Sequence, residues 1–164
     1  IWEVKNYYPK EYQYGLWALK LLDAQFDLSF PEDEAGFIAV HIISGELGND
    51  ISDFSKSVDF IKSITKIVRY YFHINIDYQS LNYNRFAVHL KFFWKAMMYK
   101  KDQSSFGDLS QEILNVIKNS DIEAYKCALK IKEYKIEKYN YELNNEEIMY
   151  LAIHINKIVS GEEK

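Results

Sequence analysis

The chain has 164 residues, of which 48% are hydrophobic and 16% aromatic, and this composition favours a packed globular protein over a disordered one. Its net charge of −4 is uneven, because residues 1–51 carry 3 basic and 9 acidic side chains, whereas residues 52–164 carry 17 and 15. Neither part is the basic surface that binds a nucleic-acid backbone, and no apolar run approaches the ~20 residues of a membrane span. The single cysteine, Cys127, excludes an internal disulfide and is predicted to be a small buried residue.

The first third of the chain is predicted to form two helices. Pro9 can occupy the first turn of a helix over about 9–25, where apolar residues recur at helical spacing. Pro31 opens a second helix over 31–46, with three acidic residues in its first turn, where the helix dipole favours negative charge. Residues 47–54 are the expected joint to the rest of the chain.

The remainder is predicted to contain five helices and no strand, since no alternating pattern is long enough for a sheet. The expected helices span about 55–73, 78–100, 109–118, 121–139 and 145–160, with a polar loop at 100–108. Ser120 or Asp121 is expected to cap the fourth of these helices, and Asn144 or Asn145 the fifth. Gly161 is expected to follow the end of the last helix.

One helical segment occurs twice. Residues 8–43 align without a gap on residues 121–156 at an offset of 113, and this alignment places His41 on His154. A repeat of this kind indicates that one module is present in two copies.

The offset also sets the expected domain boundaries. If one copy is 113 residues long, residues 52–164 form a complete five-helix domain. Residues 1–51 then form the C-terminal part of a truncated first domain, with counterparts of the last two helices only. The predicted fold class is therefore an all-α bundle preceded by two helices of a second, incomplete one.

The sequence lacks the short motifs that mark common catalytic and metal sites. We find no HExxH, CxxC, glycine-rich phosphate loop or GxSxG motif. No two of its four histidines lie three or four residues apart on one helix, which argues against a metal site. We therefore predict no metal, no cofactor and no enzymatic activity.

Two histidines share the same surroundings in the two copies. His41 and His154 each have a glutamate seven residues earlier, Glu34 and Glu147, two turns away on the same helix face. The residue four positions before each histidine is aromatic. A single histidine on an apolar face is usually structural. Its recurrence favours a function, because imidazole can gain or lose a proton near neutral pH.

The other two histidines have different neighbours. His89 follows Arg85 by four residues, so the two side chains share one helix face. A guanidinium there can pair with a phosphate on the imidazole, although a plain polar pair explains the spacing equally well. His73 follows an aromatic run at a predicted helix end and is expected to be a capping or surface residue.

Three histidine-containing segments resemble a known family. They are FPEDEAGFIAVHI (30–42), NRFAVHLKFF (84–93) and EEIMYLAIHI (146–155). They resemble the phosphotransferase-system regulation domains of the BglG/LicT/SacY transcriptional antiterminators, in the order in which that family carries them. The resemblance covers nearly the whole chain. It implies an RNA-binding domain followed by two regulation domains, each a five-helix bundle with two phosphorylatable histidines.

The resemblance assigns a role to three histidines. His41 resembles the second phosphorylation site of the first domain, and His89 and His154 resemble the two sites of the second domain. The phosphocarrier protein HPr and a sugar-specific enzyme II would be the phosphoryl donors. A phosphoryl group would be repelled beside Glu34 and Glu147 and held beside Arg85, and it would shift homodimer formation.

The function implied is that of a cytoplasmic, sugar-responsive regulatory region, with RNA bound only through a domain absent from this chain. Two alternatives remain open from the sequence. Regulation domains of this kind also occur in DNA-binding activators of sugar operons, which differ in the output domain. The chain could also be an all-α interaction module whose histidines are structural.

Overall fold

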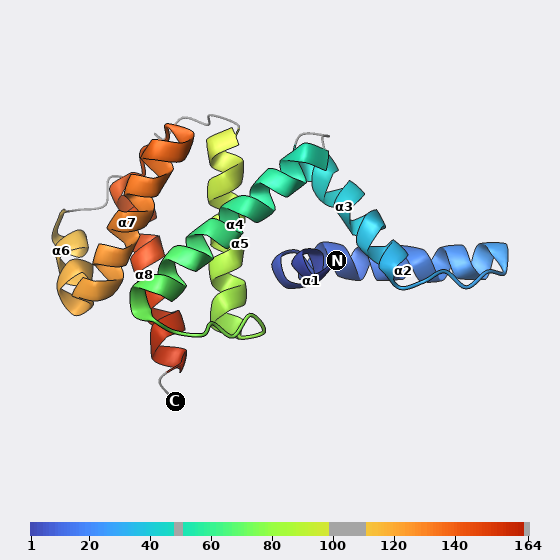
Figure 1. Cartoon of the computed structure of the whole chain (residues 1–164), viewed down its shortest axis with the longest axis horizontal. Coiled ribbons are helices and arrows are strands. Elements are labelled where there is room, and N and C mark those ends of the chain that lie inside the picture. The colour runs from blue at the N-terminus through green and yellow to red at the C-terminus, as the bar shows by residue number, and fades with distance from the viewer. Residues whose placement is uncertain (48–50, 99–110, 163–164) are drawn as a thin grey trace. The chain divides into compact units, whose positions relative to one another are not determined.

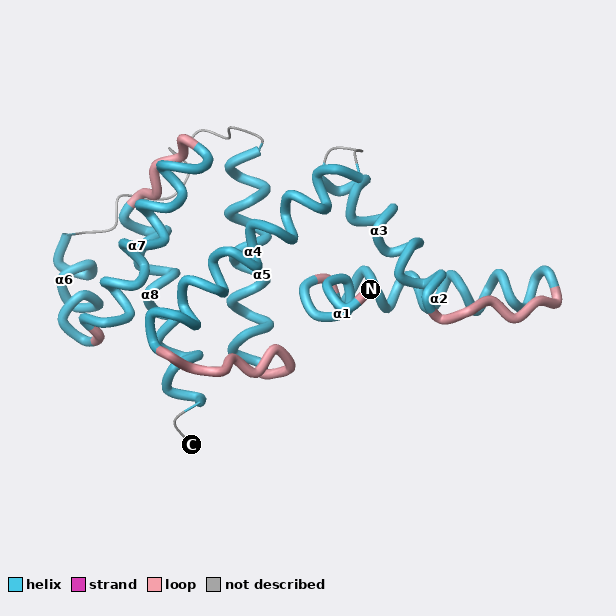
Figure 2. The backbone as a smooth tube through the Cα atoms, in the orientation of Figure 1, coloured by secondary structure: helices cyan, strands magenta, loops and turns pink. Residues whose placement is uncertain are grey.

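The computed structural model describes residues 1–47, 51–98 and 111–162, and these residues form eight helices and no strand. This confirms the predicted all-α class (Figures 1 and 2). The chain divides into two compact units, Ile1–Ile61 and Lys62–Lys164. The helices are α1 (Trp2–Tyr7), α2 (Pro9–Phe26), α3 (Asp33–Leu47), α4 (Ile51–Phe72), α5 (Leu81–Met98), α6 (Gln111–Ser120), α7 (Ile122–Tyr139) and α8 (Asn145–Glu162).

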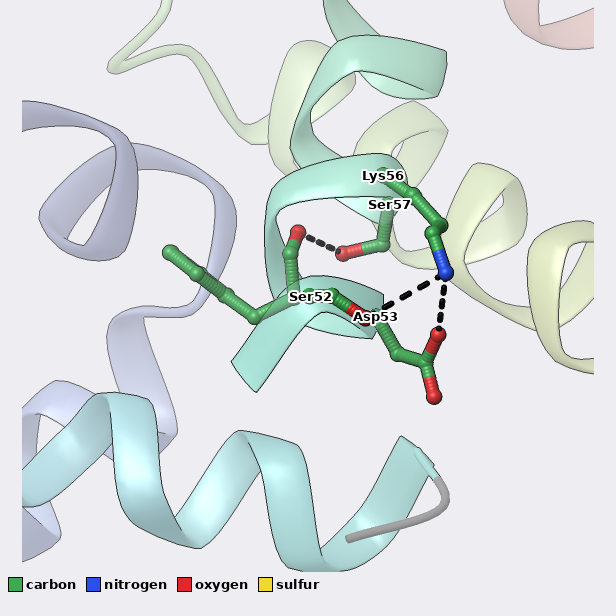
Figure 3. A network of polar contacts seen from close by, with 5 residues as sticks. Ser52, Asp53, Lys56 and Ser57 are labelled. Atoms are coloured by element: carbon green, nitrogen blue, oxygen red, sulfur yellow. Dashed lines mark hydrogen bonds and ion pairs between the residues drawn. The ribbon is translucent and has the colours of Figure 1, made fainter. Parts of the chain in front are cut away.

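The predicted joint at 47–54 lies partly outside the described residues, and its last four residues are helical. Ile51–Phe54 form the first turn of α4, so this helix begins four residues earlier than the expected start at about 55. This turn is stabilised by its own side chains, because Lys56 Nζ lies 3.3 Å from Ser52 Oγ and 3.1 Å from Asp53 Oδ1 (Figure 3). Ser57 Oγ also donates to the Phe54 carbonyl.

Two other predicted boundaries move for local reasons. Helix α5 begins at Leu81 rather than near 78, because the Ser80 hydroxyl accepts the Tyr83 N–H and caps the helix there. Helix α8 continues through Gly161, which was expected to lie beyond its end. One glycine near a helix end costs only about 1 kcal/mol relative to alanine, so it does not stop this helix. The predicted polar loop at 100–108 lies outside the described residues.

Unit 1 is built around α2 and α3, and the short helix α1, which the sequence did not predict, packs on both. Gly15 allows the two long helices to approach closely, since a Cβ there would lie 2.1 Å from the Ala35 carbonyl oxygen. The buried apolar residues of these helices are Val4, Tyr7, Tyr12, Leu19, Ala35, Ala39, Ile43 and Leu47.

A polar network ties α1, α2 and the start of α3 together. Glu32, just before α3, accepts hydrogen bonds from Tyr12 Oη at 2.6 Å and from Lys5 Nζ at 2.9 Å. The Lys5–Glu32 pair is exposed and contributes little by itself. Because Tyr12 is buried, its hydroxyl fixes the start of α3 against α2.

Unit 2 contains the rest of α4 and helices α5 to α8. Helix α8 packs against α5, α6 and α7 and is therefore the central helix of this unit. Its core contains Ile64, Val68, Phe86, Leu90, Trp94, Ala128, Ile131, Leu151, Ala152, Ile155 and Ile158. Asp121 caps α7 as predicted, by accepting the Ala124 N–H at 2.9 Å. Cys127 is buried, and burial raises the pKa of its thiol to about 12.

The close approach at Gly15 leads to a stability prediction. We expect Gly15→Ala to lower the free energy of unfolding by about 1–3 kcal/mol, because the added methyl would collide with backbone atoms that cannot move independently. Gly36→Ala is the matched control, since its Cβ would meet only the flexible Ile1 side chain at 3.1 Å. Urea unfolding followed by circular dichroism checks both variants. Equal stability of the two would contradict the proposed helix contact.

Candidate functional site

The site lies where α5 contacts α8 inside unit 2. His89 is in the middle of α5, and His154 is in the middle of α8. Each helix starts at a side-chain cap, Ser80 for α5 and Asn144 for α8, so the rotational position of each histidine is fixed from its N-terminus. The sequence predicted both histidines as functional, and the structure brings them together.

The two imidazole rings are in direct contact. Their centroids lie 4.2 Å apart, with the ring planes tilted by 38°. The ring of His89 also stacks on Tyr150, with 5.8 Å between centroids and 18° between planes. Tyr150 precedes His154 by one helical turn, so the side chain of His89 rests against two consecutive turns of α8.

Both histidines are held in the neutral state near neutral pH. Burial lowers the pKa of His89. Burial is also the main reason that the pKa of His154 falls to about 4. Repulsion from His89 in its protonated form, and from the cations Lys157 and Arg85, lowers this pKa further. A neutral imidazole carries a free lone pair on one ring nitrogen, which makes it a nucleophile or an acceptor.

Two cationic side chains lie at the edge of the pair. Arg85 is exposed on α5, one turn before His89, and Lys157 is exposed on α8, three residues after His154. Asn82 on α5 donates a hydrogen bond of 2.9 Å to the Lys157 carbonyl and links the two helices at this end. Arg85 was predicted from its spacing. Lys157 was missed, although its i+3 spacing from His154 was a usable signal.

Glu147 has a structural position that the sequence did not predict. Its backbone N–H donates to Asn144 Oδ1 at 2.8 Å, and its Oε2 accepts the Asn144 N–H at 3.0 Å. Its Oε1 accepts a hydrogen bond from Tyr141 Oη at 2.9 Å. This is a capping box at the start of α8, in which both carboxylate oxygens are engaged. Glu147 therefore positions the helix that carries His154.

A buried lysine supports the same helix start. Lys135 on α7 has no exposed surface, and its Nζ lies 4.8 Å from the ring centroid of Tyr141 and 5.1 Å from that of Phe93. Burial lowers the pKa of Lys135 to about 8, and the carboxylate of Glu147 acts in the opposite direction. Cation–π contacts with a desolvated ammonium contribute about 2 kcal/mol or more. Lys135 thus connects α7, α5 and the loop before α8.

The remaining predicted residues lie apart from this pair. His41 and Glu34 are exposed on α3 of unit 1, where Glu34 occupies the first turn of the helix. His73 follows the last residue of α4 with a φ of 54° and is exposed, as expected of a helix-capping residue. Over the described residues no three metal-binding side chains gather in one place. None of the described helices is both long and apolar enough to cross a membrane.

The lowered pKa of His154 predicts a stability that depends on pH. The unfolded imidazole binds a proton near pH 6.5, whereas the folded one does so only near its pKa of about 4. As pH falls between these values, the unfolded state binds the proton first, so the free energy of unfolding decreases, by about 1–3 kcal/mol. Below about pH 4 this contribution stops changing.

Urea unfolding at a series of pH values checks this expectation. His154→Gln should reduce the loss of stability between pH 6.5 and 4, because glutamine does not titrate. His41→Gln is the control, since it makes the same exchange at a histidine that is exposed. If wild type and His154→Gln showed the same slope, His154 would not be held neutral by burial.

The comparisons with known proteins agree with the fold. The family model described as the PRD domain matches residues 1–45 and 62–158. The transcription antiterminator LicT of Bacillus subtilis is 36% identical over 159 residues, which are 97% of this chain and 56% of that protein. The beta-glucoside operon antiterminator of Dickeya chrysanthemi is 35% identical over 159 residues, 97% of this chain and 55% of that protein. The GlcA/glcB genes antiterminator of Staphylococcus carnosus is 28% identical over 162 residues, 99% of this chain and 55% of that protein.

The chain spans about half the length of the curated relatives it matches. The family model covers most of both compact units, and the all-α architecture is that of the family. This chain belongs to the PRD domain family of the BglG/LicT-type transcription antiterminators.

Proposed function

We propose that this chain is the sugar-responsive regulatory region of a transcription antiterminator and that its histidines accept phosphoryl groups from the sugar phosphotransferase system. The observation that carries the proposal is the contact of His89 with His154, two neutral imidazoles 4.2 Å apart with cationic side chains at their edge. The names of its relatives, which regulate beta-glucoside and GlcA/glcB genes, support the sugar-related role.

The chemistry of the pair suits acceptance of a phosphoryl group. The lone pair of a neutral ring nitrogen attacks the phosphorus of a phosphohistidine on the donor. A new N–P bond forms, and the N–P bond of the donor breaks. The acceptor ring releases its N–H proton to solvent, and the departing donor imidazole takes one up, so atoms and charge balance. Arg85 and Lys157 are placed to stabilise the negative charge that arrives.

The same proposal names the phosphoryl donors of each domain and the effect of phosphorylation on the dimer. HPr would phosphorylate the second domain, which contains His89 and His154, and a sugar-specific enzyme II would phosphorylate the first, which contains His41. Residues 1–51 would be the C-terminal part of the first domain, and residues 52–164 the second. Homodimers would form or dissociate with phosphorylation in the cytoplasm, with His89 favouring the dimer and His41 opposing it. RNA would bind only through a domain outside this chain.

Incubation with phosphoenolpyruvate, enzyme I and HPr tests the proposal. We expect an added phosphoryl group in the intact mass, and peptide mapping under alkaline conditions should locate it on His89 or His154. Sedimentation equilibrium of the modified chain should show a changed mass of the assembly. If the chain stayed unmodified while HPr phosphorylated another acceptor, it would not be an acceptor for HPr.

Arg85 is expected to speed the transfer by holding the incoming phosphoryl group. Arg85→Gln should reduce the rate of phosphorylation by about ten- to a hundredfold, because a charge-assisted hydrogen bond to an anion contributes about 1.5–3 kcal/mol. Arg69→Gln is the matched control, since Arg69 is the other arginine of the chain and lies exposed on α4. The rate is measured with radiolabelled phosphoenolpyruvate. Equal rates for the two variants would exclude a role of Arg85 in holding the phosphoryl group.

A further inference from the structure

The two histidines of the pair differ in their exposure to solvent. Only 9% of the surface of His154 is exposed, whereas His89 is half-buried. In phosphoryl transfer, the donor must bring its phosphorus to within about 3–3.5 Å of the acceptor nitrogen. A donor protein can therefore approach His89 more easily than His154 while the helices keep this arrangement.

The ring of His89 itself provides part of the cover over His154. Its centroid is 4.2 Å from that of His154, and its other contact is the stack on Tyr150 at 5.8 Å. Tyr150 and His154 come from the same face of α8, one turn apart. A side chain from α5 that rests on both of them occupies space through which another molecule would have to reach His154.

A phosphoryl group on His89 is hard to accommodate in this contact. It adds about −1.5 to −2 charges and three strongly hydrated oxygens to a flat ring that now rests against two other rings. Keeping those oxygens between packed side chains would force both a steric overlap and the burial of charge. Arg85 is exposed one turn earlier on α5, so it offers the oxygens a partner at the solvent side.

We propose that His89 covers His154 and that the two histidines are modified in sequence, His89 first and His154 only after the ring of His89 has moved. This inference rests on the proposed function. The modified ring turns from the Tyr150 stack toward Arg85 and solvent, and His154 becomes open to a second donor. The second transfer has the same balance as the first, with one N–P bond formed and one broken.

Two substitutions at His89 separate its shielding of His154 from its ability to accept a phosphoryl group. His89→Phe removes the acceptor nitrogen but keeps a flat ring that can stack on Tyr150. His89→Ala removes both the nitrogen and the cover. The inference predicts that His154 stays protected in the phenylalanine variant and becomes reactive in the alanine variant. Circular dichroism and thermal unfolding of both variants confirm that the helices are intact before reactivity is compared.

The reaction of each histidine with diethyl pyrocarbonate measures how accessible His154 is, without any phosphotransferase protein. The lone pair of a neutral imidazole attacks one carbonyl carbon of the reagent, forms an N–C bond and expels ethyl carbonate, which decomposes to ethanol and carbon dioxide. The reagent is applied near pH 7, where the lowered pKa values of His89 and His154 leave both rings neutral. Differences in rate then report access. The exposed His41 and His73 serve as references within the same sample.

We expect His154 of the wild-type chain to react about tenfold or more slowly than His73, since a buried group reacts only through local opening. His154 should stay slow in His89→Phe and approach the rate of His73 in His89→Ala. Equal His154 rates in the two variants, or a wild-type His154 as reactive as His89, would overturn the inference.

Phosphorylation by phosphoenolpyruvate, enzyme I and HPr then tests the sequence of modification. In the wild-type chain, singly modified protein should carry its group on His89, and doubly modified protein should appear later. His154 should be phosphorylated in His89→Ala and about tenfold less in His89→Phe, by the same local-opening argument. Singly modified wild-type chain with its group on His154 would contradict the proposed order. If the carbethoxylation pattern held but no variant accepted phosphate, the cover would stand, while the proposed function and the order of phosphorylation would both be rejected.

Discussion

The contact between α5 and α8 is the constraint on which the site depends. It places the ring of His89 against the ring of His154, although the two residues are far apart in the chain. Small shifts of either helix along its axis would separate the rings, because one residue of a helix corresponds to about 1.5 Å of rise and 100° of rotation. The caps at both helix starts, Ser80 on one and the Asn144–Glu147 box on the other, therefore act directly on the site.

The same contact also determines the protonation of the two histidines. Burial keeps both imidazoles neutral, and the neighbouring Arg85 and Lys157 make protonation of His154 still less favourable. Positive charge around a neutral nucleophile favours the arrival of an anion. Under the proposed function, a phosphoryl group attached to this site would gain a strong new interaction with these cations. Such a gain can shift the population of two arrangements of the helices.

The two copies share a pair of helices, α2 and α3 in the first and α7 and α8 in the second, but differ in the residues that stabilise each pair. In the second copy, Lys135 and Tyr141 form a buried cation–π contact beside the start of α8. At the offset of 113, their counterparts in the first copy are Leu22 and Leu28, both exposed. Lys157 corresponds to Ser44, which is buried. The position of His154 and of the preceding Glu147 recurs in the first copy as His41 and Glu34, whereas Lys135, Tyr141 and Lys157 have no similar counterpart there.

Much of this protein was determined by the sequence itself, because helix formation depends on local spacing. The 3.6-residue period, the proline and acidic helix starts and the repeat of His41 at His154 predicted the all-α class. The three histidine segments indicated the family, which the family model confirms. Local spacing also placed Arg85 on the face of His89.

The tertiary structure decided the rest, since contacts between distant helices follow from packing of their side chains and have no local signal. Only the fold shows that the ring of His89 rests on Tyr150 and His154. Glu147 has the predicted spacing from His154, yet its oxygens serve the helix cap. The full burial of Lys135 likewise required aromatic partners from two other segments, Phe93 and Tyr141, which no spacing within its own helix could reveal.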